Sequence, residues 1–197
     1  MRRFSRTSRS FARWRARRAS RLLIEQLRGE IVAASRRTAL YERLQAPDRL
    51  DGRFELLTLH AGLVLRKLVA LGGLGGDMAQ DLVNSLFLHF DDTLREMAWS
   101  DIAVAKRLRI MKEAFYGRTS AYASAHDSRS RDELAAALAR NVYGSRADSA
   151  RNAAALADYV VSLDAALAAM PLEDFSTGRF RFPDGRIAAG DSSCPSP

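Results

Sequence analysis

Three histidines could take part in metal chemistry, because a helical bundle can hold a di-metal carboxylate site. Such sites use Glu-x-x-His pairs, which place both ligands on one face of a helix. His60, His89 and His126 each lack a glutamate three residues before them. His89 could share a face with Asp92. We interpret Asp91, Asp92 and Arg95 as the solvated face of that helix, with Asp91 and Arg95 as an i,i+4 ion pair. The sequence therefore predicts no metal site, and it predicts that His60 is a partly buried helix residue.

The sequence contains neither a phosphate-binding glycine motif nor a nucleophile motif of an enzyme active site. LGGLGGD at 71–77 follows no strand, lacks the GK[ST] ending of a phosphate loop and does not match GxGxxG, so it predicts a connector between helices. No GxSxG motif is present, and the single cysteine, Cys194, has no histidine near it in the sequence. A lone cysteine forms no intrachain disulfide, which indicates a reducing compartment. We predict a protein that is not an enzyme and has no cofactor.

A basic and aromatic stretch, WSDIAVAKRLRIMKEAFYGR at 99–118, suggests a partner more strongly than any other segment. One interpretation is a positively charged, aromatic-edged surface for a partner. The other is an ordinary amphipathic helix with a basic outer face, which spacing alone favours. After Trp99, the basic and aromatic residues of the stretch are Lys106, Arg107, Arg109, Lys112, Phe115, Tyr116 and Arg118.

The net charge of +8 resides in the first 21 of the 197 residues, which hold nine arginines and no acid. Without this segment the net charge is −1, so a nearly neutral body carries a cationic arm. The arm has no apolar core of a secretory signal. It could bind anionic lipid, act as a transit peptide, contact RNA or have no specific partner.

The elements that must position these residues are predicted to be helices. Apolar residues recur at helical spacing in six segments, with breaks at the glycines, at Pro47 and at Pro171. Asp51 is expected to cap the second helix and Ser100 or Asp101 the fourth. GRFRFP at 178–183 could form a short extended segment. The expected helices cover about 20–44, 51–71, 77–97, 101–122, 130–144 and a segment that ends at 170.

The sequence predicts an all-α fold: a single irregular bundle of about six helices, with at most one short strand pair. We expect a basic and flexible arm at 1–21, an all-α domain at 22–183 and a disordered tail at 184–197. The longest apolar stretch, at 61–76, contains Arg66 and Lys67 and is shorter than the roughly 20 apolar residues that a spanning helix needs. The residues expected in the core are Phe87, Phe90, Leu94, Leu108, Met111, Leu163 and Leu167.

Four segments in this order resemble the ubiquinol–cytochrome c chaperone family. They are DGRFELLTLHAGLVLRKL at 51–68, the run from 90 to 118 that ends in AFYGR, LARNVYG at 138–144, and LADYVVSLDAALAAMPLEDFSTGRFRFP at 156–183. The resemblance spans roughly 24–183, and AFYGR and DGRF are its most specific parts. The sequence departs from the family at 98–101, where small residues are expected, and at Ala105, where glycine is usual.

The resemblance implies an assembly chaperone for respiratory complex III that binds newly synthesised cytochrome b. It also implies contact with the ribosome near its exit and with a small partner protein, and it implies no catalytic residue. The implied location is cytoplasmic and peripheral at the inner membrane in a bacterium, or on the matrix side in a mitochondrion, with residues 1–21 on anionic lipid.

Our hypothesis for the client contact combines the start of the second helix with the basic fourth helix. The contact residues are Arg53, Lys106, Arg109, Tyr116 and Arg118. The alternative function is a helical module that binds RNA or the ribosome through the basic arm together with the Lys106–Lys112 cluster.

Overall fold

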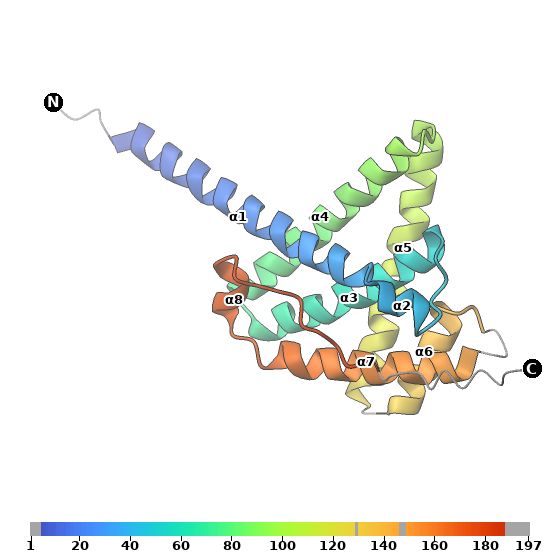
Figure 1. The fold of residues 1–197 in the computed structure, drawn as a ribbon. Helices are drawn as coiled ribbons and strands as arrows, with labels where there is room; N and C mark the ends of the chain where they lie inside the picture. The colour runs from blue at the N-terminus through green and yellow to red at the C-terminus, as the bar shows by residue number, and fades with distance from the viewer. Residues whose placement is uncertain (1–4, 129, 146–148, 188–197) are drawn as a thin grey trace, which may run out of the picture.

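The computed structural model describes residues 5–128, 130–145 and 149–187, with side chains from Ser20 onward. Helices joined by turns make up this part of the chain, and no strand occurs in it, so the predicted all-α bundle is confirmed (Figure 1). The described helices are α1 (Ser5–Ser35), α2 (Thr38–Glu42), α3 (Leu50–Leu71), α4 (Leu74–Glu96), α5 (Asp101–Asp127), α6 (Arg131–Asn141), α7 (Ala150–Ala168) and α8 (Leu172–Ser176).

Helix α3 is the central element of the bundle, since it contacts α1, α4, α5 and α7. Every residue from Phe54 to Ala61 is buried, which is expected of a helix that other helices surround. This burial includes the polar side chains of Glu55, Thr58 and His60. Each of these groups therefore needs an internal partner, or it destabilises the fold.

Caps and glycines set several helix boundaries where the sequence predicted them. Gly72 and Gly73 have positive φ angles of 63° and 46° between α3 and α4, a conformation that glycine adopts without steric cost. The hydroxyl of Ser100 accepts a hydrogen bond from the Ala103 N–H at the start of α5. The expectation that Asp51 caps α3 was wrong by two residues, because Arg49 is the N-cap and makes no side-chain capping bond.

The first predicted helix is broken into α1 and α2 by a turn that no glycine or proline marks. Arg37 has an extended conformation there, with φ −58° and ψ 126°. Its guanidinium group donates to the carbonyl oxygens of Phe182 and Pro183, at 3.1 and 2.9 Å. The turn thus joins α1 to the C-terminal segment. Helix α1 runs without interruption across residue 21, so the expected end of the basic arm does not coincide with an element boundary.

The C-terminal segment after α8 lies across the bundle without forming a strand, so the extended segment expected at 178–183 has no ladder partner in the described residues. The Gln26 side chain donates to the Gly178 carbonyl, and Glu30 accepts from the Phe182 N–H. Phe180 and Phe182 are buried. The body therefore includes this segment as far as the described residues extend, while 188–197 of the predicted tail lie outside them.

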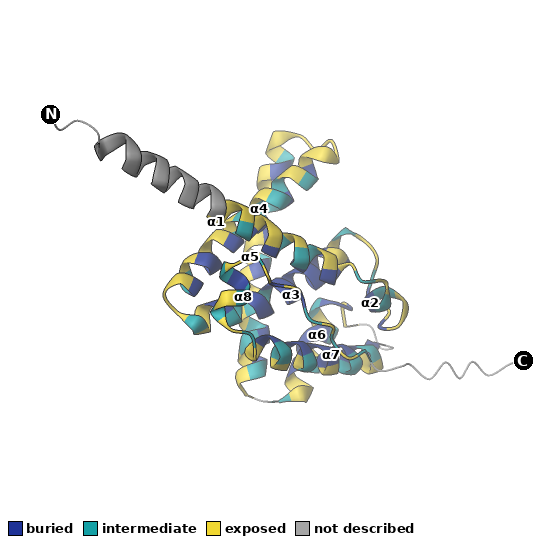
Figure 2. Ribbon diagram, turned by 60° about the vertical axis from the view of Figure 1, so that its left-hand side comes forward, coloured by how far each residue is buried: buried dark blue, intermediate teal, exposed yellow. Residues whose placement is uncertain are grey.

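Most of the predicted core is buried (Figure 2). Phe87 and Leu108 were expected inside but are only partly buried, because each lies at the border of its helix's apolar stripe and packs against the core from the side. The residues confirmed as buried are Phe90, Leu94, Met111, Leu163 and Leu167. No helix of the described residues is long and apolar enough to cross a bilayer.

The turn between α4 and α5 projects away from the rest of the bundle (Figures 1 and 2). Three large apolar side chains are exposed around it: Met97 at 49%, Trp99 at 38% and Ile102 at 85%. Ala98 has a positive φ of 59°, which costs an L residue of the order of 1 kcal/mol. Exposed apolar side chains grouped on a projecting turn are unusual in a monomer and mark a candidate contact surface.

Candidate functional site

Of the five residues predicted to contact a client, Arg53 lies on α3 and the other four lie on two different sides of α5. Lys106, Arg109 and Tyr116 are exposed along its outer face. Arg118 follows Arg109 by nine residues, which at 100° per residue places it about 180° away. It faces α3, where its guanidinium group is bonded to Glu55. The structure therefore joins Lys106, Arg109 and Tyr116 in one surface and separates Arg118 from them.

Arg118 belongs to a polar groove between the start of α3, α5 and the end of α6, with a volume of about 340 Å³. Its Nε donates to both carboxylate oxygens of Glu55, at 2.5 and 2.6 Å. Arg107 forms an ion pair with Asp51 at the same groove. These contacts fasten α5 to the first turns of α3. Arg118 thus has a structural role that the sequence pattern did not reveal.

Glu55 is the most perturbed acid of the groove. Its side chain is only 7% exposed, and this burial raises the pKa of its carboxyl group to about 7, although Arg118 acts in the opposite direction. Desolvation disfavours the charged form of a buried acid, and the single Arg118 Nε–H shared between the two carboxylate oxygens does not fully compensate here. The carboxyl group of Glu55 therefore changes its charge near neutral pH.

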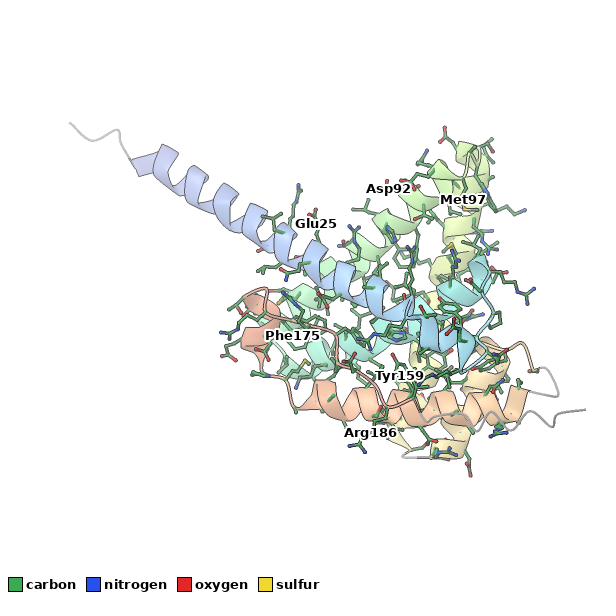
Figure 3. The ribbon with its side chains drawn as sticks, viewed as in Figure 1. Glu25, Asp92, Met97, Tyr159, Phe175 and Arg186 are labelled. Carbon is green, nitrogen blue, oxygen red and sulfur yellow. The ribbon has the colours of Figure 1, made fainter. Side chains whose placement is uncertain are left out.

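Arg53 lines a second groove, on the other side of the first turns of α3, with a volume of about 360 Å³. We call it the apolar groove. Its apolar lining comes from α3, α4 and α5, and Met97 stands half exposed where the groove meets the projecting turn (Figure 3). The apolar lining residues are Leu50, Phe54, Leu57, Phe90, Leu94, Met97 and Met111.

The rim of the apolar groove is positively charged. Arg36, Arg49 and Arg53 line it and are exposed, and Asp48 is the only acid among the lining residues. Asp48 is already bonded to Arg53, at 2.6 Å. The guanidinium groups of Arg36 and Arg49 make no ion pair or hydrogen bond with a described residue. The rim therefore carries two positive charges in excess.

His89 also lines the apolar groove, and burial is the largest cause that lowers its pKa, followed by the positive charges of Arg28 and Arg36. A lowered pKa keeps the ring neutral at neutral pH.

In the described part of the chain, no three histidine, cysteine, aspartate or glutamate side chains lie together as metal ligands would. The Asp91–Arg95 pair that the sequence predicted is present, at 2.8 Å.

His60 is fully buried rather than partly buried as predicted, and its ring is satisfied on both sides. Nδ1 lies 2.7 Å from the Leu56 carbonyl oxygen, and Nε2 lies 2.9 Å from the Tyr159 hydroxyl. Burial lowers its pKa to about 4, so the ring is neutral: Nδ1–H donates to Leu56, and Nε2 accepts from Tyr159. This bond connects α3 to α7 in the core, and we assign it a structural role.

Known proteins resemble this chain both in sequence and in fold. The profile described as "Ubiquinol-cytochrome C chaperone" matches residues 42–182. A curated relative, "Ubiquinol-cytochrome-c reductase complex assembly factor 1" of Xenopus laevis, is 28% identical over 120 residues, which are 61% of this chain and 60% of the relative's length. A solved structure, "Crystal structure of the Cbp3 homolog from Brucella abortus", is 31% identical with a TM-score of 0.76, over 86% of this chain and 93% of that one.

Proposed function

Because this chain belongs to the ubiquinol–cytochrome c chaperone family, we propose that it binds newly synthesised cytochrome b and promotes the assembly of ubiquinol–cytochrome c reductase without catalysing a reaction. The observation that carries the proposal is the family match over residues 42–182. This match includes α3, α4, α5, α6, α7 and α8.

The surface of the protein supports a binding role. A chaperone for a membrane subunit needs exposed apolar area, because its client is apolar until its own partners cover it. The apolar groove and the projecting α4–α5 turn supply such area. Exposed charge beside apolar surface adds discrimination between partners. The client contact that we propose is the apolar groove with Arg53 at its rim. Lys106, Arg109 and Tyr116 form a separate surface on the outer face of α5, which is the alternative contact surface.

We further propose peripheral contact with anionic lipid through residues 1–21, at the cytoplasmic face of the inner membrane in a bacterium or the matrix face in a mitochondrion. Each arginine near an anionic surface contributes about 1 kcal/mol. Contact with the ribosome near its exit and with a small partner protein is part of the same proposal. Arg118, in contrast, lines the polar groove and is bonded there to Glu55 through its Nε, so a client contacts it only within that groove.

The second candidate function is binding of RNA or the ribosome, favoured by the nine arginines of the first 21 residues. Phosphate contacts release counterions, so such binding should fall steeply as salt concentration rises. Binding to an apolar client should depend much less on salt. A titration of purified protein with RNA at several salt concentrations separates the two functions.

The proposed function is tested in cells that lack this protein. The spectral signal of cytochrome b and the amount of complex III should fall strongly, while the other respiratory complexes remain. Returning the full chain should restore both. Normal complex III in the depleted cells would contradict the proposal.

A further inference from the structure

We propose that the apolar groove is the docking site for an apolar helical segment of the client that carries a carboxylate at its flank. The inference rests on the proposed function and adds the place of contact and the chemistry of the segment. Neither follows from the family match.

The shape and composition of the groove fit a helical segment. Three helices supply its apolar lining, and its volume of about 360 Å³ lies in the range of sites that accept a group of side chains. An apolar helix face placed in a groove between helices is a common mode of peptide recognition. Met97 and Met111 both line the groove, and flexible methionine side chains adapt to different apolar surfaces.

Access to the groove is open on the side of the projecting turn. Met97 lines the groove and is 49% exposed, so apolar surface is accessible at the end of the groove next to the turn. The floor residues Phe54 and Phe90 contact each other edge to face, with ring centroids 5.6 Å apart, which gives the groove a firm base.

The positive charge at the rim of the groove favours a bound segment with a negative charge at its flank. Arg36 and Arg49 are exposed and have no ionic partner among the described residues, whereas Arg53 is already neutralised by Asp48. A carboxylate near the bound apolar segment would give these two guanidinium groups a counterion. Arginine forms bidentate bonds with carboxylates, which fix orientation as well as adding affinity. A cationic flank would instead be repelled.

Two other cations provide a matched comparison. Lys106 and Arg109 are exposed on the outer face of α5 and line neither groove. Reversing the charge of Lys106 and Arg109 changes the net charge of the chain as much as reversing Arg36 and Arg49. Only Arg36 and Arg49 line the apolar groove. A difference in crosslink yield between the two double variants would therefore show that the position of the charges matters and not the net charge of the chain.

The test uses the full chain in cells that make cytochrome b, with the photo-crosslinking residue p-benzoylphenylalanine at one position at a time. Met97→p-benzoylphenylalanine should give a crosslink to cytochrome b, and Arg109→p-benzoylphenylalanine should give at most a tenth of its yield. In the Met97 background, the substitutions Arg36→Glu and Arg49→Glu together should lower the yield at least tenfold. Lys106→Glu and Arg109→Glu together should change it less than twofold.

Folding and client capture are measured beside the crosslink. All four charged residues are exposed, so circular dichroism and thermal melting should show both double variants folded. A crosslink from position 109 without one from position 97, a crosslink from position 97 to phospholipid only, or an unchanged yield after charge reversal at the groove would overturn the inference. If tagged wild-type chain recovers no cytochrome b, the proposed function itself fails, and the inference fails with it.

Discussion

Replacing Arg118 with methionine removes the counterion of a buried acid, and the effect on stability should depend on pH. The two residues are joined by bonds of 2.5 and 2.6 Å from the Arg118 Nε to the Glu55 carboxylate. In the wild-type protein the pKa of Glu55 is raised from 4.5 to about 7, mainly by burial. Because the folded-state pKa is above the unfolded value, the stability linked to this acid is present below pH 4.5 and lost as pH rises through 7.

The size of the variant's effect follows from the further rise of this pKa. Fully buried carboxyl groups without a partner reach a pKa of roughly 8 to 9. A rise of the Glu55 pKa by one to two units above 7 corresponds to about 1.4 to 2.7 kcal/mol of the free energy of unfolding. The variant loses this free energy only at pH values at which Glu55 is ionised in the wild-type protein. Arg118→Met should therefore lower the free energy of unfolding by less than about 1 kcal/mol at pH 5.5. At pH 9 it should lower it by about 2 to 3 kcal/mol.

Urea denaturation followed by circular dichroism at pH 5.5 and pH 9 measures both values. The double variant Glu55→Gln with Arg118→Met has no acid at this position, so its stability relative to wild type should not show the extra loss at pH 9. Arg109→Met, an exposed change on the same helix, is the control and should be nearly neutral at both pH values. Equal destabilisation by Arg118→Met at pH 5.5 and pH 9 would refute the buried-acid explanation.

Three further predictions concern the core, the outer face and the arm. Tyr159→Phe leaves the buried Nε2 of His60 without a donor and should lower the free energy of unfolding by about 1 to 3 kcal/mol, measured by urea denaturation. Lys106→Ala with Arg109→Ala should change the same free energy by less than about 0.5 kcal/mol each, because both side chains are exposed. Deletion of 1–21 should leave the melting temperature nearly unchanged but weaken sedimentation with anionic vesicles. Equal sedimentation of the truncated and full chains would eliminate the lipid-anchor role.

Much of the fold could be predicted because its signals are local. The serine at position 100 and the glycines at 72 and 73 act at the boundaries where capping and backbone rules place them. The break after Ser35 could not be predicted in this way. It depends on the bonds from Arg37 to the carbonyls of Phe182 and Pro183, about 145 residues away in the chain.

The candidate site was only partly predictable. Counting nine residues from Arg109 to Arg118 at 100° per residue already places them on opposite sides of α5, so this separation was available from the sequence. The partner of Arg118 was not, because Glu55 comes from another helix. The apolar groove was hidden for the same reason: its rim and floor come from segments around 36, 49–57, 89–97 and 111 that only the folded bundle brings together.

Affinity capture shows directly whether this protein binds cytochrome b. Tagged full-length chain is recovered from cells in which complex III is being assembled, after mild detergent treatment of the membranes. Cytochrome b should be recovered with it and be enriched over the membrane subunits of other respiratory complexes. Recovery of ribosomal RNA in a strongly salt-dependent manner, with no enrichment of cytochrome b, would contradict the proposed binding of cytochrome b.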